Sequence, residues 1–131
     1  MANVEDYFQN GEVYVWKETF AVAKSKKPID GAFACIQDQS EITVVVDEAR
    51  MEKQPYDFLE VNRGWKIITF DMLLPLELVG FIAKVATVLA EEKIDILTFS
   101  AYSTEHVLVQ EKDLPKAFEK LKSLGCRITE K

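Results

Sequence analysis

Few side chains in this chain could carry out covalent or metal chemistry. His106 is the only histidine, and neither a serine nor a cysteine stands next to it as a nucleophile. Cys35 and Cys126 lie far apart and form no Cys-x-x-Cys pair, so thiols and imidazoles alone cannot assemble a zinc site. We therefore predict no catalytic residue, no metal site and no cofactor. His106 is expected to be structural or an incidental part of a pocket wall. The two cysteines could form a disulfide, but the preferred interpretation is two reduced thiols inside or beside strands.

Two carboxylates and one helix start could instead bind a small polar molecule without reacting with it. A helix predicted to begin near Leu76 has no Ser, Thr, Asp or Asn immediately before it, so its free amides could bind a carboxylate. Glu77 and Glu105 could bind an ammonium group. Each residue also has a structural interpretation. Glu77 suits any first helical turn, Glu105 could be the solvated start of a strand, and Gly80 could either admit a ligand or permit close helix–sheet packing.

The composition excludes several classes of protein. The chain has 131 residues, 48% of them hydrophobic and 29% charged, which fits one compact unit or two very small ones. Its net charge of −6 is opposite in sign to that of a nucleic-acid binder and would be repelled by anionic membranes. The N-terminal residues contain no apolar run, and no stretch reaches the ~18 apolar residues of a membrane helix. A cytoplasmic location is expected.

The elements that would position the polar residues are clearest in the second half. The apolar periodicity there predicts a ferredoxin-like βαββαβ order, in which two helices cover one face of a four-stranded sheet. The predicted elements are a strand over Trp65–Met72, a helix over about Leu76–Glu92, strands over Ile96–Tyr102 and Glu105–Gln110, a helix capped by Asp113 and closed by Gly125, and a strand over Cys126–Thr129.

The first half is predicted to be a degenerate copy of the same unit. The predicted elements are strands over Glu12–Phe20, Gly31–Gln37 and Glu41–Asp47 and a short helix over Asp47–Lys53 capped by Asp47, with a loop over Ala21–Asp30. The segment Ser40–Glu48 resembles Thr104–Lys112, so Glu41 is the counterpart of Glu105. The predicted fold class is therefore α+β, with two ferredoxin-like halves over 1–62 and 63–131. The first half has a shortened or missing first helix, and the halves meet near Val61–Trp65.

Six segments in one order resemble a known family. They are Gly64–Ile68, Leu74–Ala83, Leu89–Ile96, Phe99–Glu105, Val107–Val109 and Leu114–Gly125. Together they resemble the tandem ACT-domain proteins of the CASTOR type, which are relatives of the aspartokinase regulatory domains. The first half is similar at Gly31–Phe33 and over Glu41–Val45. The resemblance covers nearly the whole chain after Glu12.

The resemblance implies a non-catalytic sensor that binds a free amino acid at an interface between ACT-like halves or subunits. Animal members of the wider group sense arginine. The ligand would lie against the loop Met72–Phe81 and the turn Ser103–Val107. This chain has Glu105 and His106 where the family usually has Asp and an aromatic residue, which leaves the ligand's identity open. The ligand-binding residues that the resemblance predicts are Leu76, Glu77, Gly80, Phe81, Ile82, Ser103, Thr104 and Glu105.

The resemblance implies two partners, a small amino acid and a second copy of the chain, and a degenerate half would also leave a sheet edge to cover. Neither nucleic acid nor membrane is expected, and the sequence does not name a downstream protein. Other ferredoxin-like classes lack their motifs: Met72–Phe81 has no arginine for an acylphosphatase and no Cys-x-x-Cys for a metal chaperone, and Val107–Val109 has none of the aromatic and basic residues of an RNA-recognition domain. The alternative is a ligand-free protein-interaction module with the ACT fold.

Overall fold

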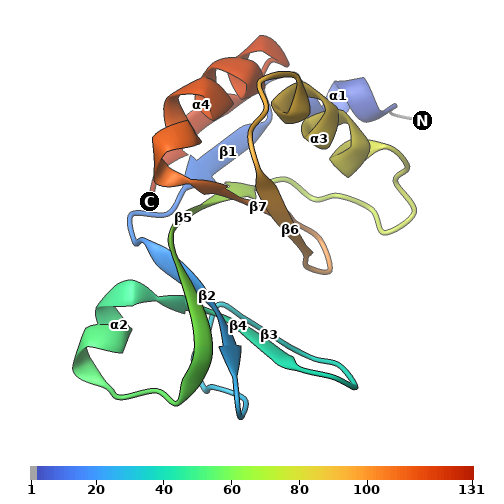
Figure 1. Ribbon diagram of the computed structural model, residues 1–131. Helices are drawn as coiled ribbons and strands as arrows, with labels where there is room; N and C mark the ends of the chain where they lie inside the picture. The colour runs from blue at the N-terminus through green and yellow to red at the C-terminus, as the bar shows by residue number, and fades with distance from the viewer. Residues whose placement is uncertain (1–2) are drawn as a thin grey trace. The chain divides into compact units, whose positions relative to one another are not determined.

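The computed structural model describes residues 3–131, whose contacts group them into two compact units (Figure 1). Unit 1 contains the described residues up to Lys17 together with Lys66–Lys131, and unit 2 contains Glu18–Trp65. Unit 2 is thus inserted into the sequence of unit 1. The assignment of one ACT-like half to 1–62 and another to 63–131 stays a prediction. The contacts themselves place the N-terminal strand with the C-terminal residues.

Unit 1 contains the predicted βαββαβ order with one further strand. Its helices and strands are α1 (Val4–Phe8), β1 (Glu12–Val15), the last part of β5 (Phe58–Phe70), α3 (Phe81–Glu91), β6 (Ile96–Ser100), β7 (Glu105–Gln110), the 3-10 turn η1 (Glu111–Asp113), α4 (Leu114–Ser123) and β8 (Arg127–Glu130). The strand order is β6-β7-β5-β1-β8. Because β1 is antiparallel to β5 and parallel to β8, the sheet is mixed.

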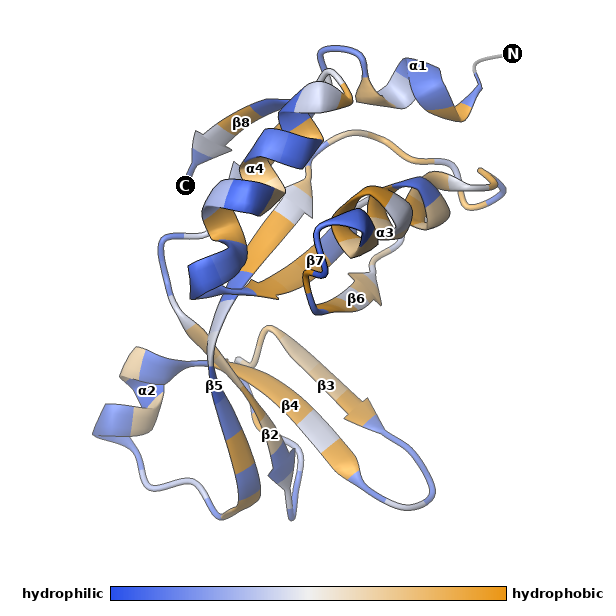
Figure 2. Ribbon diagram, turned by 45° about the horizontal axis from the view of Figure 1, so that its top comes forward, coloured by the Kyte–Doolittle hydropathy of each residue, from blue (hydrophilic) through white to orange (hydrophobic). Residues whose placement is uncertain are grey.

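The helices α3 and α4 cover one face of this sheet (Figure 1). The apolar residues of α3 recur at helical spacing and pack on Ile68 and Phe70 of β5 and on Val107 and Val109 of β7. The buried residues of α4 are Ala117 and Leu121. Figure 2 shows that hydrophilic residues make up much of the remainder of this helix. The core of unit 1 therefore lies between this helix pair and one sheet face.

Unit 2 is an antiparallel sheet with a single short helix. Its elements are β2 (Phe20–Ser25), β3 (Ala34–Gln37), β4 (Ile42–Asp47), α2 (Glu48–Lys53) and the first part of β5, in the strand order β3-β4-β2-β5. Asp47 caps α2 as predicted, because its Oδ1 accepts from Ala49 N at 2.9 Å. No helix joins β2 to β3 within the described residues of unit 2, so the predicted loss of the first helix is confirmed and the fold class is α+β.

Three predictions about the strands were wrong. The predicted loop Ala21–Asp30 begins as a strand, because Ala21 and Ala23 are buried against Val44 and Val46. The alternate buried positions hold the small residues Ala21, Ala23 and Ser25, so the segment lacks the large apolar residues that indicate a buried strand face. The predicted strand Glu12–Phe20 is two strands that belong to different units. The 13-residue strand β5 also extends seven residues before the predicted start at Trp65.

The helix predicted from Leu76 begins only at Phe81. Leu78 N donates to Pro75 O at 3.0 Å, so residues 75–78 form a turn. Gly80 then takes the left-handed conformation, with φ of 92°, as the N-cap of α3. At the other end of the unit, Gly125 has φ of 105°, as its predicted role after α4 requires. Asp113 precedes α4 but makes no side-chain capping bond, which corrects that prediction.

Candidate functional site

A pocket of about 240 Å³ lies in unit 1 between the loop before α3 and the turn between β6 and β7. We call it the loop–turn pocket. Two backbone hydrogen bonds hold its walls: Leu74 N donates to Ser103 O at 2.8 Å, and Ala101 N donates to Thr104 O at 2.9 Å. The pocket is lined by Leu74, Pro75, Leu76, Leu78, Phe81, Ser100, Ala101, Tyr102, Ser103, Thr104 and Glu105.

Five of the eight residues named from the sequence line this one pocket, namely Leu76, Phe81, Ser103, Thr104 and Glu105. The other three lie outside its lining. Glu77 is exposed in the turn after Pro75, and Ile82 packs against the core of unit 1. A Cβ on Gly80 would meet no atom within 4 Å, so its positive φ, and not a close approach, explains the glycine.

The inner wall of the pocket is the Phe81 ring, which also belongs to the core. Phe81 is 5% exposed and stacks on Phe8 with ring centroids 4.7 Å apart, and it meets Phe70 edge-on at 5.2 Å. The sequence analysis missed the contribution of Ser100, Ala101 and Tyr102. The signal that could have found them is their place at the end of an edge strand beside the predicted turn.

Glu105 supplies the pocket's carboxylate. It is opposite Ser100 in the β6–β7 register, and Ser100 Oγ donates to Glu105 Oε1 at 2.7 Å. Among residues 3–131 no cationic side chain forms an ion pair with Glu105. The start of α3 has no side-chain cap, so the amides beginning at Phe81 can bind an anionic group. The pocket thus offers one anionic side chain and one set of backbone donors.

Thr104, on the same wall, is bonded to the single histidine. His106 Nε2 lies 3.2 Å from Thr104 Oγ1, and His106 Nδ1 lies 2.8 Å from Thr69 Oγ1. Thr69 Oγ1 also accepts from Trp16 Nε1 at 2.7 Å. Burial lowers the pKa of His106 from its usual value, because desolvation disfavours the charged ring. The polar network therefore surrounds a neutral imidazole at pH 7.

The outer rim of the loop–turn pocket is apolar and exposed. Leu76 and Tyr102 line the pocket and are 66% and 79% exposed, and Leu73 and Val79 on the adjoining loop are 82% and 85% exposed. Large apolar side chains this exposed, and gathered at one place, are typical of a surface that another molecule covers.

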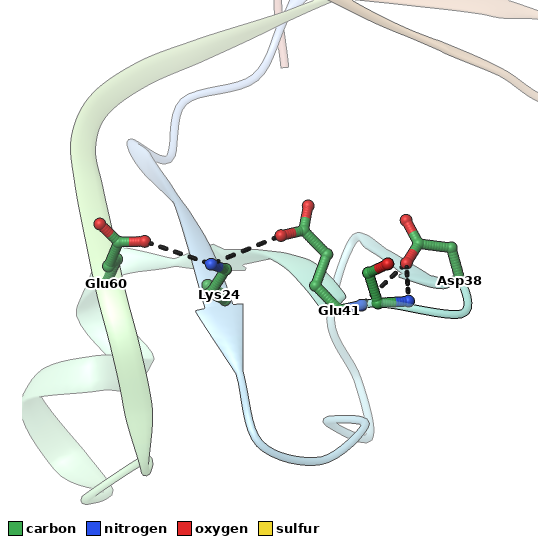
Figure 3. A network of polar contacts seen from close by, with 5 residues as sticks. Lys24, Asp38, Glu41 and Glu60 are labelled. Atoms are coloured by element: carbon green, nitrogen blue, oxygen red, sulfur yellow. Dashed lines mark hydrogen bonds and ion pairs between the residues drawn. The ribbon is translucent and has the colours of Figure 1, made fainter.

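Unit 2 contains a counterpart of Glu105 that is already paired (Figure 3). Glu41 stands just before β4 as Glu105 stands at the start of β7, and each of these strands occupies the second position of its sheet. Lys24 Nζ lies 3.5 Å from Glu41 Oε1 and 3.5 Å from Glu60 Oε2. Asp38 accepts from the Ser40 and Glu41 amides at 2.7 and 2.8 Å, and these hydrogen bonds lower the pKa of its carboxyl group.

A larger hollow of about 600 Å³ in unit 2 is lined by residues of the β2–β3 loop, of α2 and of the α2–β5 loop. Arg50 from α2 donates to Gly31 O at 2.7 Å and to Asp30 O at 3.3 Å, which ties the helix to the loop that replaces the missing helix. Tyr56 also lines this hollow, and its buried hydroxyl has no hydrogen-bond partner among residues 3–131.

Replacing Tyr56 by phenylalanine should stabilise the protein by about 1 kcal/mol, because it removes a buried hydroxyl without removing a hydrogen bond. Urea denaturation of Tyr56→Phe and wild type measures the difference. Tyr102→Phe is the matched control, since Tyr102 is 79% exposed and should change stability little. A loss of stability in Tyr56→Phe alone would mean that the hydroxyl has a partner in solution.

The two cysteines should differ strongly in reactivity. Both thiols are free, Cys35 is exposed on β3, and Cys126 is buried, which raises the pKa of its thiol to about 11. At pH 8 iodoacetamide should therefore modify Cys35 in the native protein and leave Cys126 intact until the protein is unfolded. Mass spectrometry of Cys35→Ser and Cys126→Ser separates the two sites. Rapid native labelling of Cys35→Ser would contradict the expectation.

The described part of the chain holds no group of three or more metal-ligand side chains. In the same residues, no helix has the length and apolar character needed to cross a bilayer.

Unit 1 has a ferredoxin-like fold, with two helices on one face of its sheet. The ACT domain family model matches residues 60–123. It covers most of β5, both core helices and the strands that form the loop–turn pocket. The search of curated proteins found no match.

Solved structures with the same fold cover nearly the whole chain. A protein from Agobacterium tumefaciens is 21% identical, with a TM-score of 0.76 over 93% of this chain and 94% of that chain. A Vibrio cholerae protein of unknown function, described as a possible transport protein, is 18% identical, with a TM-score of 0.72 over 90% and 93%. The ligand-free regulatory subunit of aspartate kinase from Thermus thermophilus is 9% identical, with a TM-score of 0.62 over 86% and 95%. The predicted resemblance to aspartokinase regulatory domains is confirmed for the fold.

Proposed function

We propose that this chain is a non-catalytic regulatory protein that binds one free amino acid in the loop–turn pocket. The observation that carries the proposal is that five residues named from the sequence line a single pocket in the ACT domain. Its volume of about 240 Å³ lies below the ~300–1,000 Å³ of pockets for drug-sized ligands, which suits a small metabolite. The α-carboxylate would bind the amides at the start of α3, beginning at Phe81, and the ammonium or a cationic side chain would bind Glu105.

A comparison of Glu105 with Glu41 supports the proposal that Glu105 binds the cationic group of the ligand. In unit 2 the ammonium group of Lys24 neutralises Glu41 at 3.5 Å. Glu105 occupies the corresponding strand position in unit 1 and forms no ion pair among the described residues. A bound amino acid would supply to Glu105 the charge that Lys24 supplies to Glu41.

The ligand would lie at an interface between ACT-like halves or subunits. A second copy of the chain is the favoured partner, because Leu76 and Tyr102 of the pocket lining, and Leu73 and Val79 of the same loop, are large apolar residues left exposed. Binding would order the Met72–Phe81 loop and stiffen the joint between the halves, and a downstream protein would respond to that shift in population. Light scattering with and without ligand tests the homodimer.

A thermal-shift screen of the twenty amino acids tests the function, since a bound ligand raises the melting temperature in proportion to RT ln(1 + [L]/Kd). With the best amino acid, Glu105→Gln should bind about ten- to a hundredfold more weakly, a loss of ~1.5–3 kcal/mol for a charged hydrogen bond. Glu77→Gln is the matched control, because Glu77 lies outside the pocket lining. Calorimetric titration measures both affinities, and undiminished affinity in Glu105→Gln would remove that carboxylate from the site.

The alternative function is a ligand-free protein-interaction module. The exposed apolar rim favours it, since such a rim would serve a protein partner equally well. Absence of any amino-acid binding at millimolar concentration, and no amino acid released on denaturing the purified protein, would favour this module over the sensor.

A further inference from the structure

The hollow of about 600 Å³ in unit 2 lies beside the loop that replaces the missing helix. In unit 1 the corresponding connection, between β5 and β6, contains α3, whereas the β2–β3 connection of unit 2, all of it described, contains no helix. The volume of this hollow lies within the ~300–1,000 Å³ typical of pockets for small molecules. All of its lining residues belong to unit 2, so one compact unit forms the whole hollow.

Arg50 of α2 lies in the lining and is held by backbone carbonyls, not by an acid. Its Nη1 donates to Gly31 O at 2.7 Å and its Nη2 donates to Asp30 O at 3.3 Å. Gly31 makes room for the guanidinium group, because a Cβ there would lie 2.5 Å from Nη1. The other two arginines, Arg63 and Arg127, each pair with a glutamate. Within residues 3–131 the charge of Arg50 is therefore fixed in place with no carboxylate to neutralise it.

Lys27 adds a second cation to the same lining. The buried Ser25 fixes the loop at this point, since its Oγ donates to Lys27 O at 2.6 Å and accepts from Lys27 N at 3.3 Å. The Lys27 ammonium group forms no ion pair among the described residues. Of the two acids in the lining, Asp57 is already paired with Lys26 at 3.4 Å, which leaves Asp30. Two cations and one carboxylate of the lining thus lack an ion-pair partner in residues 3–131.

Tyr56 is an independent indication that the hollow takes a ligand. Its side chain belongs to the lining and stacks on Phe58 with ring centroids 5.2 Å apart. Among residues 3–131 its hydroxyl is the one buried side-chain polar group without a hydrogen-bond partner. Native proteins rarely contain such a group, because its desolvation is not compensated. An acceptor oxygen of a molecule bound in the hollow would supply the missing partner.

We propose that this hollow binds a small organic phosphate, with the phosphate group on Arg50 and Lys27. A guanidinium and an ammonium group together match the nearly two negative charges of a phosphate monoester, whereas a carboxylate supplies one. The Asp30 carboxylate would repel a second acidic group and would accept a hydrogen bond from a hydroxyl of the ligand. A phosphorylated polyol carries both groups. The site shares no residue with the loop–turn pocket and does not depend on the proposed function.

Glycerol 3-phosphate is the probe, and titration calorimetry at constant ionic strength above pH 7 measures its affinity. Lys27→Gln should bind it about tenfold more weakly, because a charged contact is lost. Lys53→Gln is the matched control, since Lys53 is an exposed lysine of α2 that lies outside the lining and forms no ion pair among the described residues. Its affinity should stay within about twofold of wild type. Equal losses in the two variants, or no binding by the wild type at millimolar concentration, would overturn the proposal.

Two further variants test the other proposed contacts. Arg50→Lys keeps the charge but loses the planar fork, so affinity should again fall about tenfold. Tyr56→Phe should bind the probe several-fold more weakly, although the same change is expected to stabilise the empty protein. Because Arg50 also ties α2 to the loop, thermal unfolding without the probe checks that each variant is folded. If Arg50→Lys is unfolded, the exposed Lys27 decides the outcome.

Two other ligands test the chemical class. Glycerate carries a carboxylate in place of the phosphate and should bind at least about tenfold more weakly than glycerol 3-phosphate, because it brings one negative charge. Inorganic phosphate lacks the hydroxyl groups and should also bind more weakly. Glycerate that binds as tightly as glycerol 3-phosphate would overturn the assignment to a phosphate. Glu105→Gln should leave the affinity for glycerol 3-phosphate unchanged, because Glu105 lines the loop–turn pocket, so the two sites are tested separately.

Discussion

A fragment that contains only residues 63–131 should not unfold cooperatively, although it includes every element of the βαββαβ order. The missing strand β1 pairs with β5 through Val13 and Val15, and these two side chains are 0% and 4% exposed in the core. β1 also pairs with β8 along its whole length. Without β1, the edges of β5 and β8 are unpaired and the core opens to water. Thermal unfolding followed by circular dichroism should show no sigmoidal transition for this fragment.

Two control experiments test whether the loss of cooperative unfolding is due to the missing strand β1. A synthetic peptide of residues 3–17 added to the fragment should restore the transition. A single chain that joins Lys17 to Lys66 through a short glycine linker, without unit 2, should also fold, because Trp16 N donates to Ile67 O at 3.0 Å and the two backbones are therefore neighbours. A sharp transition for 63–131 alone, close to that of the full chain, would show that β1 is dispensable.

Phe81→Ala should lower the free energy of unfolding by about 3–5 kcal/mol, a large share of the ~5–15 kcal/mol typical of a whole protein. The reason is that Phe81 joins two aromatic contacts, with Phe8 and with Phe70, at a site that is 5% exposed. The same change removes the inner wall of the loop–turn pocket, so ligand affinity should fall in parallel. Urea denaturation at 25 °C measures the loss.

Tyr102→Ala is the matched control for this prediction. It removes another aromatic ring from the lining of the same pocket, but Tyr102 is 79% exposed, so stability should change by less than about 0.5 kcal/mol. Equal losses in Phe81→Ala and Tyr102→Ala would contradict the assignment of Phe81 to the core.

The second half of the fold could be predicted because its signals are local. The apolar residues Phe81, Val85 and Leu89 recur at helical spacing, and Gly125 marks the end of α4. Both signals depend on neighbours in the sequence, and both hold in the structure. The position of β1 between β5 and β8 could not be predicted, because nothing within Glu12–Val15 specifies partners near Ile68 and Arg127. The start of α3 was placed too early because Leu76 and Leu78 continue the apolar pattern through a turn.

The residues of the candidate site could be predicted where the family resemblance gave their positions in the sequence. The hydrogen bonds between side chains from different strands could not be predicted. Ser103, Thr104 and Glu105 were named from the turn and do line the pocket. Glu77 was named as a possible partner of the ligand's ammonium group, but its carboxylate lies outside the pocket lining, and α3 starts only at Phe81. His106 of β7 contacts Thr69 of β5 and Thr104 of the turn before β7. The contact with Thr69 depends on which strands are neighbours in the sheet, and the local sequence contains no signal for that pairing.

The insertion of unit 2 into unit 1 also sets the order in which the chain can fold while a ribosome makes it. Glu18–Trp65 is contiguous, so unit 2 can close as soon as its own last residues emerge. Strand β1 is synthesised before all of unit 2, yet it must wait for β5 and then for β8, whose residues Arg127–Glu130 are made much later. During that interval the apolar face of β1 has no permanent partner. Translation speed through the second half of the message, and not only the sequence of β1, therefore decides how long this strand is exposed to misfolding and to chaperones.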